Sequence, residues 1–457
     1  MLKRKIEHRL EKFYSDRGKS ALLIDGARQV GKSFIVESFG RRHYESVIVI
    51  DFLHQQEARA IFKDVTDASE ILTRITAFSR QPLIPGKTLV FFDEIQECVE
   101  VVTYIKYLVR EGSCHYILSG SLLGVAIKNV KSEPVGYMDD VTMYPLDFEE
   151  FIVAVGERPE LLDAARTAWE SQKPLAKVYH DRLNKLLRLY LVVGGMPAAV
   201  QRYVDTKDIR QVVDEQKKIL KYYRKDITKY DEQNALRIHA VFDRLAPELN
   251  DKNKRFYADS VEEGGRFDRL TDEFLWLKEA GVAIPAYNVM EPKQPLILAK
   301  RPNFFKLFMN DVGLLAALYM DGIQLKILNG ETDINFGAVY ENFVAQELKA
   351  HGFEPNYYNT AKFGELDFVV EHKMKVLPIE VKSGKHYERH RALTHIMEVE
   401  EYGLGEALVF TDDSVNRKGK IRYLPIYQVM FLQKDVLPES MVYELPPLRS
   451  RVCHQYG

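Results

Sequence analysis

The chain contains few cysteines: three among 457 residues, at positions 98, 114 and 453. None belongs to a CxxC pair, so we expect neither a disulfide framework nor a cysteine-based zinc site, and a reducing cytoplasm is the expected compartment. No run of about eighteen apolar residues occurs, which argues against a membrane span. The first twenty residues are charged throughout and have no apolar segment, so they do not form a signal peptide.

An excess of charge of one sign is also lacking. The sequence has 64 Lys and Arg against 66 Asp and Glu, a formal net charge of −2. No global positive field therefore indicates a nucleic-acid partner, and any such site has to be a local patch. The length, with 46% hydrophobic residues, is that of a globular protein of two to four domains.

Residues 21–33, ALLIDGARQVGKS, have the phosphate-loop spacing G-x-x-x-x-G-K-[ST]. A buried strand is predicted before the loop and a helix ending at Gly40 after it, which favours a phosphate loop over a chance glycine-rich turn. Such a loop surrounds a polyphosphate with N–H groups, its lysine reaches the β- and γ-phosphates, and its hydroxyl ligates Mg²⁺. The candidate ATP-binding residues are Gly26, Ala27, Arg28, Gln29, Val30, Gly31, Lys32, Ser33 and Phe34.

Residues 87–97, KTLVFFDEIQE, predict a second buried strand with two carboxylates at its end. Parallel α/β sheets bind ligands at the carboxyl ends of their strands. We expect Asp93 to hold Mg²⁺ and Glu94 to polarise the attacking water, so hydrolysis is favoured over binding alone. Without the phosphate loop, the alternative interpretation of this pattern is an ordinary strand whose two terminal carboxylates lie in a solvated loop.

Two further strands complete the predicted sheet. Residues 115–121, HYILSGS, end at Ser119 and Ser121, which either contact the γ-phosphate and water or mark a plain strand end. Residues 47–52, VIVIDF, place Asp51 at a similar position. Four buried strands that alternate with helical segments predict a doubly wound parallel sheet in an α/β fold.

A helical region is predicted after Pro145, with a first helix that begins near Asp147 and a long segment from about residue 158 to 227. The glycines and proline of residues 194–197 have to interrupt it. This region is a candidate lid over the nucleotide. Arg224 lies in a basic segment with interleaved aromatics and is either an arginine finger or phosphate contact, or part of a solvated helix face.

Residues 236–319 predict short helices followed by two strands, at 282–289 and 294–299. Helices followed by a β-hairpin suggest a winged helix, which either reads DNA or contacts protein. The helix in RLTDEFLWLKEAG is acidic, and this favours a contact with protein.

A second set of charged residues lies near the C-terminus. Asp367 is predicted on one strand, Glu380 and Lys382 share a face of the next, and Glu341 lies on the apolar face of a helix. Two carboxylates on adjacent strands with a lysine can bind Mg²⁺ and activate water, as in D-x(n)-E-x-K nucleases. A surface ladder of salt bridges is the open alternative.

Nearly the whole chain resembles prokaryotic AAA-family ATPases with an N-terminal P-loop domain and a C-terminal domain of unknown function related to PD-(D/E)XK nucleases. The motifs that carry the resemblance are GARQVGKS, LVFFDEIQE, YILSGS, YPLDFEEF, LVVGGMP, FKLFMNDVGLLAAL, YENFVAQEL and ELDFVV with IEVKSG. The resemblance implies ATP binding, a sensing role near Ser119, a winged helix and a nuclease-like fold that uses Glu341, Asp367, Glu380 and Lys382. Related chains often have a basic residue where this chain has Tyr137, so an arginine finger is not carried over there.

The expected organisation is a P-loop ATPase core at 1–155, a helical lid at 156–235, a winged-helix-like domain at 236–320 and a nuclease-like domain at 321–457. The leading hypothesis is a Mg²⁺-dependent ATPase whose nucleotide state controls the C-terminal domain. The alternatives are an ATP-gated metal-dependent DNA nuclease and an ATPase whose inactive nuclease-like fold binds nucleic acid or protein. ATP or ADP is the expected ligand and no membrane partner is expected, whereas DNA bound through the C-terminal half and assembly into a homo-oligomer are left open.

Overall fold

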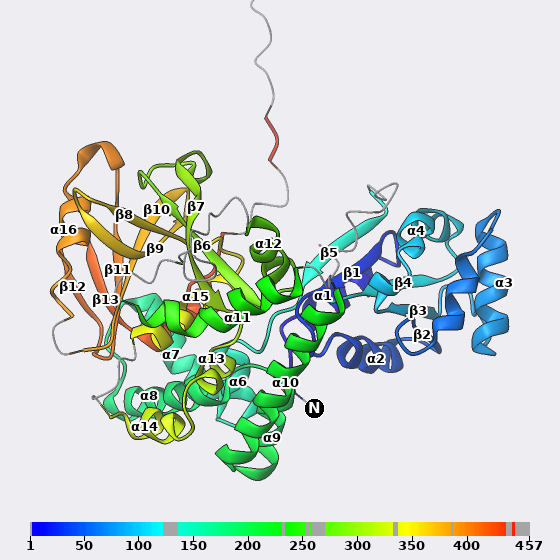
Figure 1. The fold of residues 1–457 in the computed structure, drawn as a ribbon, viewed down its shortest axis with the longest axis horizontal. Helices are drawn as coiled ribbons and strands as arrows, with labels where there is room; N and C mark the ends of the chain where they lie inside the picture. Colours follow the sequence, from blue (N-terminus) through cyan, green and yellow to red (C-terminus); the bar gives the residue numbers. More distant parts are fainter. Residues whose placement is uncertain are drawn as a thin grey trace, which may run out of the picture.

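The computed structural model describes residues 2–121, 136–230, 234–251, 256, 270–331, 337–384, 387–435 and 441–443. Two β-sheets organise this part of the chain, and helices lie around and between them (Figure 1). The N-terminal sheet lies at the right of Figure 1 and the C-terminal sheet at the left.

The N-terminal sheet confirms the predicted parallel α/β fold. Its strand order is β2-β3-β4-β1-β5, and every pairing is parallel. The strands are β1 (Ala21–Asp25), β2 (Ser46–Asp51), β3 (Thr88–Asp93), β4 (His115–Ser119) and β5 (Met138–Thr142). Strand β5 was not predicted, because its sequence MDDVT lacks an apolar run and its side chains are mostly exposed.

Helices cover both faces of this sheet, so it is doubly wound as predicted. Its helices are α1 (Glu7–Ser15), α2 (Lys32–His43), α3 (Ala68–Ser79) and α4 (Glu100–Glu111), with short 3₁₀ helices at Gln56–Phe62 and Ile95–Glu97. Helix α2 does not end at Gly40 but continues to His43. A Cβ atom at Gly40 would lie 2.9 Å from Leu89 Cδ2, so this glycine permits close packing of helix on strand.

A helical region follows, with the break that the sequence predicts. Its helices are α6 (Phe148–Ala154), α7 (Pro159–Ser171), α8 (Lys177–Val193), α9 (Pro197–Thr206) and α10 (Ile209–Tyr230). Asp147 caps α6 in a capping box with Glu150, which explains why that helix begins there. Helix α8 ends before Gly194 and α9 begins at Pro197.

The C-terminal sheet has eight strands in the order β12-β13-β11-β10-β9-β8-β6-β7 and mixes parallel with antiparallel pairs. The strands are β6 (Ala283–Val289), β7 (Lys300–Met309), β8 (Asn356–Thr360), β9 (Gly364–His372), β10 (Lys375–Lys382), β11 (Ala407–Thr411), β12 (Asn416–Lys418) and β13 (Ile421–Pro425). The accompanying helices are α11 (Ala235–Asn250), α12 (Thr271–Glu279), α13 (Val312–Leu318), α14 (Ile323–Asn329), α15 (Gly337–Ala350) and α16 (Arg391–Met397), with 3₁₀ helices at Leu296–Ala299, Glu400–Tyr402 and Ile426–Phe431.

The strand predicted at residues 294–299 is wrong. Leu296–Ala299 form a 3₁₀ helix, and the second strand of the hairpin is β7, which follows directly. Ile297 and Leu298 of the apolar run LILA are exposed, whereas the buried residues of β7 lie in its second half. The hairpin of β6 and β7 pairs with β8 and is therefore part of the eight-stranded sheet. Most of residues 252–269, which the winged-helix prediction includes, lie outside the described residues.

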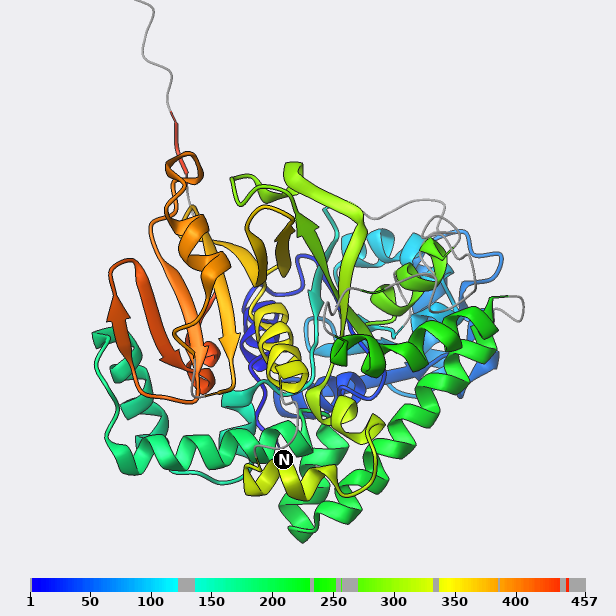
Figure 2. The ribbon, with the colours of Figure 1, turned by 60° about the vertical axis from the view of Figure 1, so that its left-hand side comes forward.

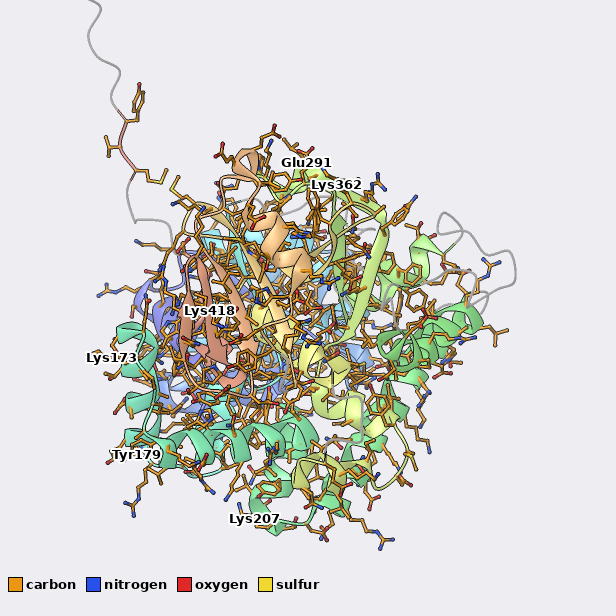
Figure 3. The ribbon with its side chains drawn as sticks, turned by 90° about the vertical axis from the view of Figure 1, so that its left-hand side faces the viewer. Lys173, Tyr179, Lys207, Glu291, Lys362 and Lys418 are labelled. Carbon is orange, nitrogen blue, oxygen red and sulfur yellow. The ribbon has the colours of Figure 1, made fainter. Side chains whose placement is uncertain are left out.

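One buried cluster joins the two sheets. It extends from Leu22 and Ile24 in β1 to Phe368 in β9 and Phe410 in β11, and it includes α8 and α15. Helix α15 lies against one face of the C-terminal sheet (Figure 2), and α16 covers the other. Figure 3 views the structure from the side of the C-terminal sheet, with Glu291 and Lys362 at the top of the view and Tyr179 at the lower left. No helix among the described residues is long and apolar enough to span a membrane.

The contact between Gly195 and Leu146 yields a test of this architecture. Leu146 N donates a hydrogen bond to Gly195 O at 2.7 Å, and a Cβ atom at Gly195 would lie 2.0 Å from Leu146 O. Gly195→Ala is therefore expected to destabilise the protein by about 2 kcal/mol or more in urea unfolding. Gly384→Ala is the control, since no atom lies within 4 Å of its Cβ position. Equal midpoints for the two variants would contradict the close contact.

Candidate functional site

The loop between β1 and α2 has the backbone geometry of a phosphate loop. Gly26 and Gly31 have φ angles of 136° and 96°, and Gln29 also lies in the left-handed region at 66°. At Gly26 a Cβ atom would lie 2.2 Å from Met143 O, so only glycine fits. Val30 and Ala27 are buried, whereas Phe34 on the first turn of α2 is 62% exposed.

Lys32 opens helix α2 and turns back into the loop. Its side chain is buried, and Nζ donates to the carbonyl oxygens of Gly26 and Ala27, each at 2.9 Å. Burial lowers the pKa of Lys32, while the nearby carboxylates of Glu94 and Asp93 act in the opposite direction. The ammonium thus lies inside the ring of loop atoms, close to two acids.

Asp93 joins three elements of the predicted site. The hydroxyl groups of Ser33 in α2 and Ser119 at the end of β4 donate to opposite oxygens of its carboxylate. Burial raises the pKa of Asp93, and the two serines act to lower it. The structure therefore brings together Lys32, Ser33, Asp93 and Ser119, which the sequence placed in three separate motifs.

Glu94 follows Asp93 with a left-handed backbone, at φ 54°, a conformation that costs a non-glycine residue about 1–2 kcal/mol. Its carboxylate accepts hydrogen bonds from Gln96 Nε2 and, at 3.4 Å, from Ser121 Oγ. The strained turn directs Glu94 toward the end of β4, beside the Asp93 group. The sequence analysis did not predict a role for Gln96. Its position two residues after Glu94 was the one sequence feature that could have indicated a contact with that carboxylate.

The loop also contacts elements far along the chain. Arg28 forms an ion pair with Asp226 on α10, and Tyr223 Oη, also on α10, donates to Arg28 O at 3.4 Å. A Cβ atom at Gly281, between α12 and β6, would lie 2.9 Å from Ala27 N. Arg224 instead pairs with Asp243 of α11 at 2.8 Å. No pattern in the sequence pointed to Asp226 or Gly281.

The second predicted group of residues also comes together. Strands β9 and β10 are antiparallel neighbours, and Asp367 Oδ2 accepts a hydrogen bond from Val381 N at 2.8 Å. Lys382 Nζ lies 2.6 Å from Glu380 Oε1, so these two side chains share a face as predicted. Glu341 is buried on α15, at 2% exposure.

A lysine that the sequence did not reveal completes this group. Lys306 on β7 is fully buried, with Nζ 2.6 Å from Glu365 Oε1 and 3.8 Å from Glu341 Oε2. Although burial favours the neutral amine, these carboxylates raise the pKa of Lys306 above its usual value. It was missed because the second strand of the hairpin was predicted at residues 294–299, so no strand was expected at β7, where Lys306 lies.

Asp367 and Glu380 are the residues predicted to bind a metal here. Glu380 Oε2 is buried and has no hydrogen-bond partner, which fits a cation ligand. Burial, and then the charge of Asp367, raise the pKa of Glu380 to about 8. Among the described residues, no group of three or more His, Cys, Asp and Glu side chains is arranged to hold a metal ion.

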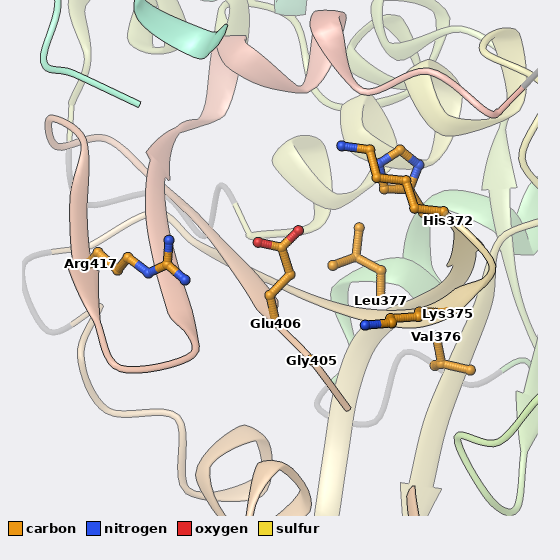
Figure 4. A pocket seen from close by; sticks show the side chains of 8 residues that line it. His372, Lys375, Val376, Leu377, Gly405, Glu406 and Arg417 are labelled. Carbon is orange, nitrogen blue, oxygen red and sulfur yellow. The ribbon is translucent and has the colours of Figure 1, made fainter. Parts of the chain in front are cut away.

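A separate pocket of about 300 Å³ lies at the turn between β9 and β10, lined by His372, Lys375 and Arg417 among others (Figure 4). Asp367 is five residues from His372 along β9, about 17 Å for an extended strand. None of the predicted site residues lines this pocket, so it is distinct from both groups.

The first group defines a class of protein. A glycine loop between a parallel strand and a helix, a buried lysine inside it, and a strand-end Asp-Glu pair bonded to the loop serine are the parts of a P-loop nucleoside triphosphatase.

Residues 18–152 match the model of the AAA domain family. These residues therefore form an ATPase domain of the AAA type. Residues 184–326 and 336–429 match two families described only as domains of unknown function, DUF8612 and DUF4143. The relation of the C-terminal part to nucleases stays a prediction.

Solved structures show a distant likeness. The Walker-type ATPase PabY2304 of Pyrococcus abyssi is 16% identical, with 70% of this chain and 96% of that chain covered and a TM-score of 0.40. The Orc1 protein of Aeropyrum pernix, solved in complex with DNA, is 11% identical, with coverage of 71% and 94% and a TM-score of 0.31. Because these scores are low, the assignment depends on the family match. No curated protein matches the chain.

The raised pKa of Glu380 predicts a dependence of stability on pH. A carboxyl whose folded-state pKa exceeds its unfolded value binds its proton more tightly when folded, so its contribution to stability falls as pH rises from about 4.5 to 8. The free energy of unfolding of the wild type minus that of Glu380→Gln should therefore be larger at pH 5 than at pH 8. Urea unfolding with EDTA present measures this difference. The exposed Glu398→Gln variant controls for the loss of one charge. A constant difference across this range would contradict the assignment.

Proposed function

We propose that the protein binds and hydrolyses ATP with Mg²⁺, and that its nucleotide state controls the C-terminal domain. The observation that carries the proposal is the bonding of Asp93 to both Ser33 and Ser119 beside the buried Lys32. A buried ammonium beside a hydroxyl and a carboxylate is the set of groups with which P-loop ATPases bind phosphates and Mg²⁺, and this supports the proposal.

Each residue then has a defined task. Lys32 leaves the carbonyl oxygens of Gly26 and Ala27 and binds the β- and γ-phosphates. Ser33 and Asp93 would hold Mg²⁺, which would neutralise charge on the phosphates. Glu94 orients and polarises the attacking water, and Ser119 senses the γ-phosphate through Asp93.

Contacts of the loop support control of the C-terminal half. Arg28 is paired with Asp226 of α10, and Ala27 touches the turn at Gly281, which leads into the C-terminal sheet. A phosphate that reorganises the loop changes both contacts. Binding energy is thereby converted into movement of the helical region, residues 156–235, as a lid, and of the hairpin of β6 and β7.

For the C-terminal domain, residues 321–457, we propose a nuclease-like fold. The support is the carboxylate pair of Asp367 and Glu380 with Lys382 at 2.6 Å from Glu380. Asp367 and Glu380 would hold Mg²⁺, Lys382 would orient water, and Glu341 would support the site. A binding module that keeps this fold without cleavage is the second candidate, favoured by the ion pairs that Lys306 makes with Glu341 and Glu365.

ATP turnover tests the first site. Lys32→Ala should weaken ATP binding at least about 100-fold, because the γ-phosphate loses a buried cation. Glu94→Gln should keep ATP binding and lose turnover by at least about 100-fold, because the amide is a poor base. The matched controls are the exposed Lys63→Ala and Glu57→Gln. Binding by filter retention and phosphate release report the two steps, and undiminished turnover in Glu94→Gln would refute the role of that residue.

Cleavage of duplex and single-stranded DNA, with Mg²⁺ or Mn²⁺ and with or without ATP, tests the second site. Cleavage that disappears in both Asp367→Ala and Lys382→Ala, and persists in the exposed Lys362→Ala, is the expected result for a nuclease. DNA binding without cleavage under either metal would favour the binding module. Cleavage that survives both substitutions would exclude the proposed residues.

A further inference from the structure

Arg4, near the N-terminus, holds the phosphate loop from outside. Its guanidinium is largely buried and donates from Nη1 to Val30 O at 3.0 Å, from Nη2 to Tyr144 O at 2.6 Å and from Nε to Glu150 Oε2 at 3.2 Å. Three bonds from one planar, permanently charged group fix both its position and its orientation.

The bond to Val30 constrains the part of the loop that would bind phosphate. Val30 immediately precedes Gly31 and Lys32, and Arg4 Nη1 lies 4.0 Å from the Cβ position of Gly31. A carbonyl held on the outer side of the loop leaves the next N–H groups along the chain directed inward, where a polyphosphate binds. Tyr144 follows Met143. The carbonyl oxygen of Met143 packs against Gly26 at the other end of the loop, where it would lie 2.2 Å from a Cβ atom.

Arg4 is also one member of a buried charge cluster. Glu150, its acidic partner, completes the capping box of α6 with Asp147. Lys5 joins both acids, since its backbone N donates to Glu150 Oε1 and its Nζ donates to Asp147 Oδ2 at 2.6 Å. The first residues of the chain and the start of α6 therefore form one hydrogen-bonded unit.

The cluster continues into the C-terminal half through helix α15. Glu347 Oε1 accepts from Phe148 N, the first residue of α6, at 3.0 Å. His351 Nε2, one turn further along the chain from Glu347, lies 3.5 Å from Asp147 Oδ2 and 3.7 Å from Glu347 Oε2. Two side chains at the end of α15 thus contact the unit that Arg4 anchors.

The same helix carries Glu341 of the second candidate site. Glu341 precedes Glu347 by six residues, about 9 Å along the helix axis. Buried contacts therefore run from Val30 through Arg4 and Glu150 to Asp147 at the start of α6, and the next residue, Phe148, bonds through its backbone N to Glu347 on α15.

We propose that Arg4 is a positioning residue for the phosphate loop and that the cluster of Arg4, Lys5, Asp147, Glu150, Glu347 and His351 transmits occupancy of the loop to α15. This inference depends on the proposed function, since it names the route by which nucleotide state reaches the C-terminal domain. A bound polyphosphate draws the N–H groups of the loop inward, and Arg4 passes the shift to α6 and α15 as a change in a packed charge network.

Two variants separate the two roles of the cluster. Arg4→Gln removes the anchor of the loop, with Arg4→Lys as the conservative form and the exposed Arg41→Gln as the matched control. Glu347→Gln keeps an acceptor for Phe148 N, but it replaces the carboxyl group, whose pKa is raised by burial and by the charge of Asp147, with an amide that cannot exchange a proton with Asp147 or His351. The measurements are the Kd for a fluorescent ATP analogue with Mg²⁺, kcat and KM for ATP, and hydrogen exchange of residues 337–350 with and without ATP.

We expect Arg4→Gln to raise the Kd and KM about tenfold, because a charged hydrogen bond to the loop is lost, with Arg4→Lys intermediate and Arg41→Gln unchanged. Glu347→Gln should keep turnover within about twofold of wild type yet lose the ATP-dependent change in exchange of α15. Wild-type binding and turnover in Arg4→Gln would overturn the positioning role. An unaltered exchange response in Glu347→Gln would overturn the route. Absence of turnover in the wild type would refute the proposed ATPase reaction alone, because Kd and exchange still test this inference.

Discussion

The buried carboxylate of Asp93 is the constraint on which the N-terminal site depends. A charged oxygen pair inside a protein needs partners, and here each oxygen has one serine, from α2 and from β4. These bonds fix the start of helix α2 against the ends of two neighbouring strands. The phosphate loop lies between β1 and α2, so its shape depends on where α2 is held.

The loop is held from several sides, and this distinguishes it from a free surface turn. Arg4 binds it at Val30, α10 binds it at Arg28 through Asp226, and the turn at Gly281 touches Ala27. Each partner belongs to a different part of the chain, and a single buried cluster joins those parts. A conformational change of the loop therefore alters the packing of these elements, which cannot deform independently.

The sequence was sufficient for the elements whose pattern is local. The loop spacing, the apolar strands that end at Asp93 and Ser119, the capped helix after Asp147 and the adjacent strands of Asp367 and Glu380 all depend on short-range periodicity and turn chemistry. Partners such as Asp226 and Lys306 were not predictable, since each is an ordinary charged residue whose role arises only from long-range packing. The misplaced strand at Leu296 has the same origin: LILA is apolar, but the sheet pairs the segment after it.

The two candidate sites share one electrostatic feature, which is a buried or partly buried lysine surrounded by several carboxylates. At the first, Lys32 lies among Asp25, Asp93 and Glu94, and at the second, Lys306 and Lys382 lie among Glu341, Glu365, Asp367 and Glu380. In each group the carboxylates outnumber the lysines, and at the first group Arg28 adds a further positive charge. Burial, and to a smaller extent the neighbouring carboxylates, raise the pKa values of Asp93 and Glu380, and protonation of either residue would reduce the excess of negative charge. A bound cation would take over that task and release the proton, so metal affinity at both sites should strengthen as pH rises. At a group that takes up a cation as proposed, the desolvation that raises these pKa values would also strengthen the attraction between the carboxylates and the cation.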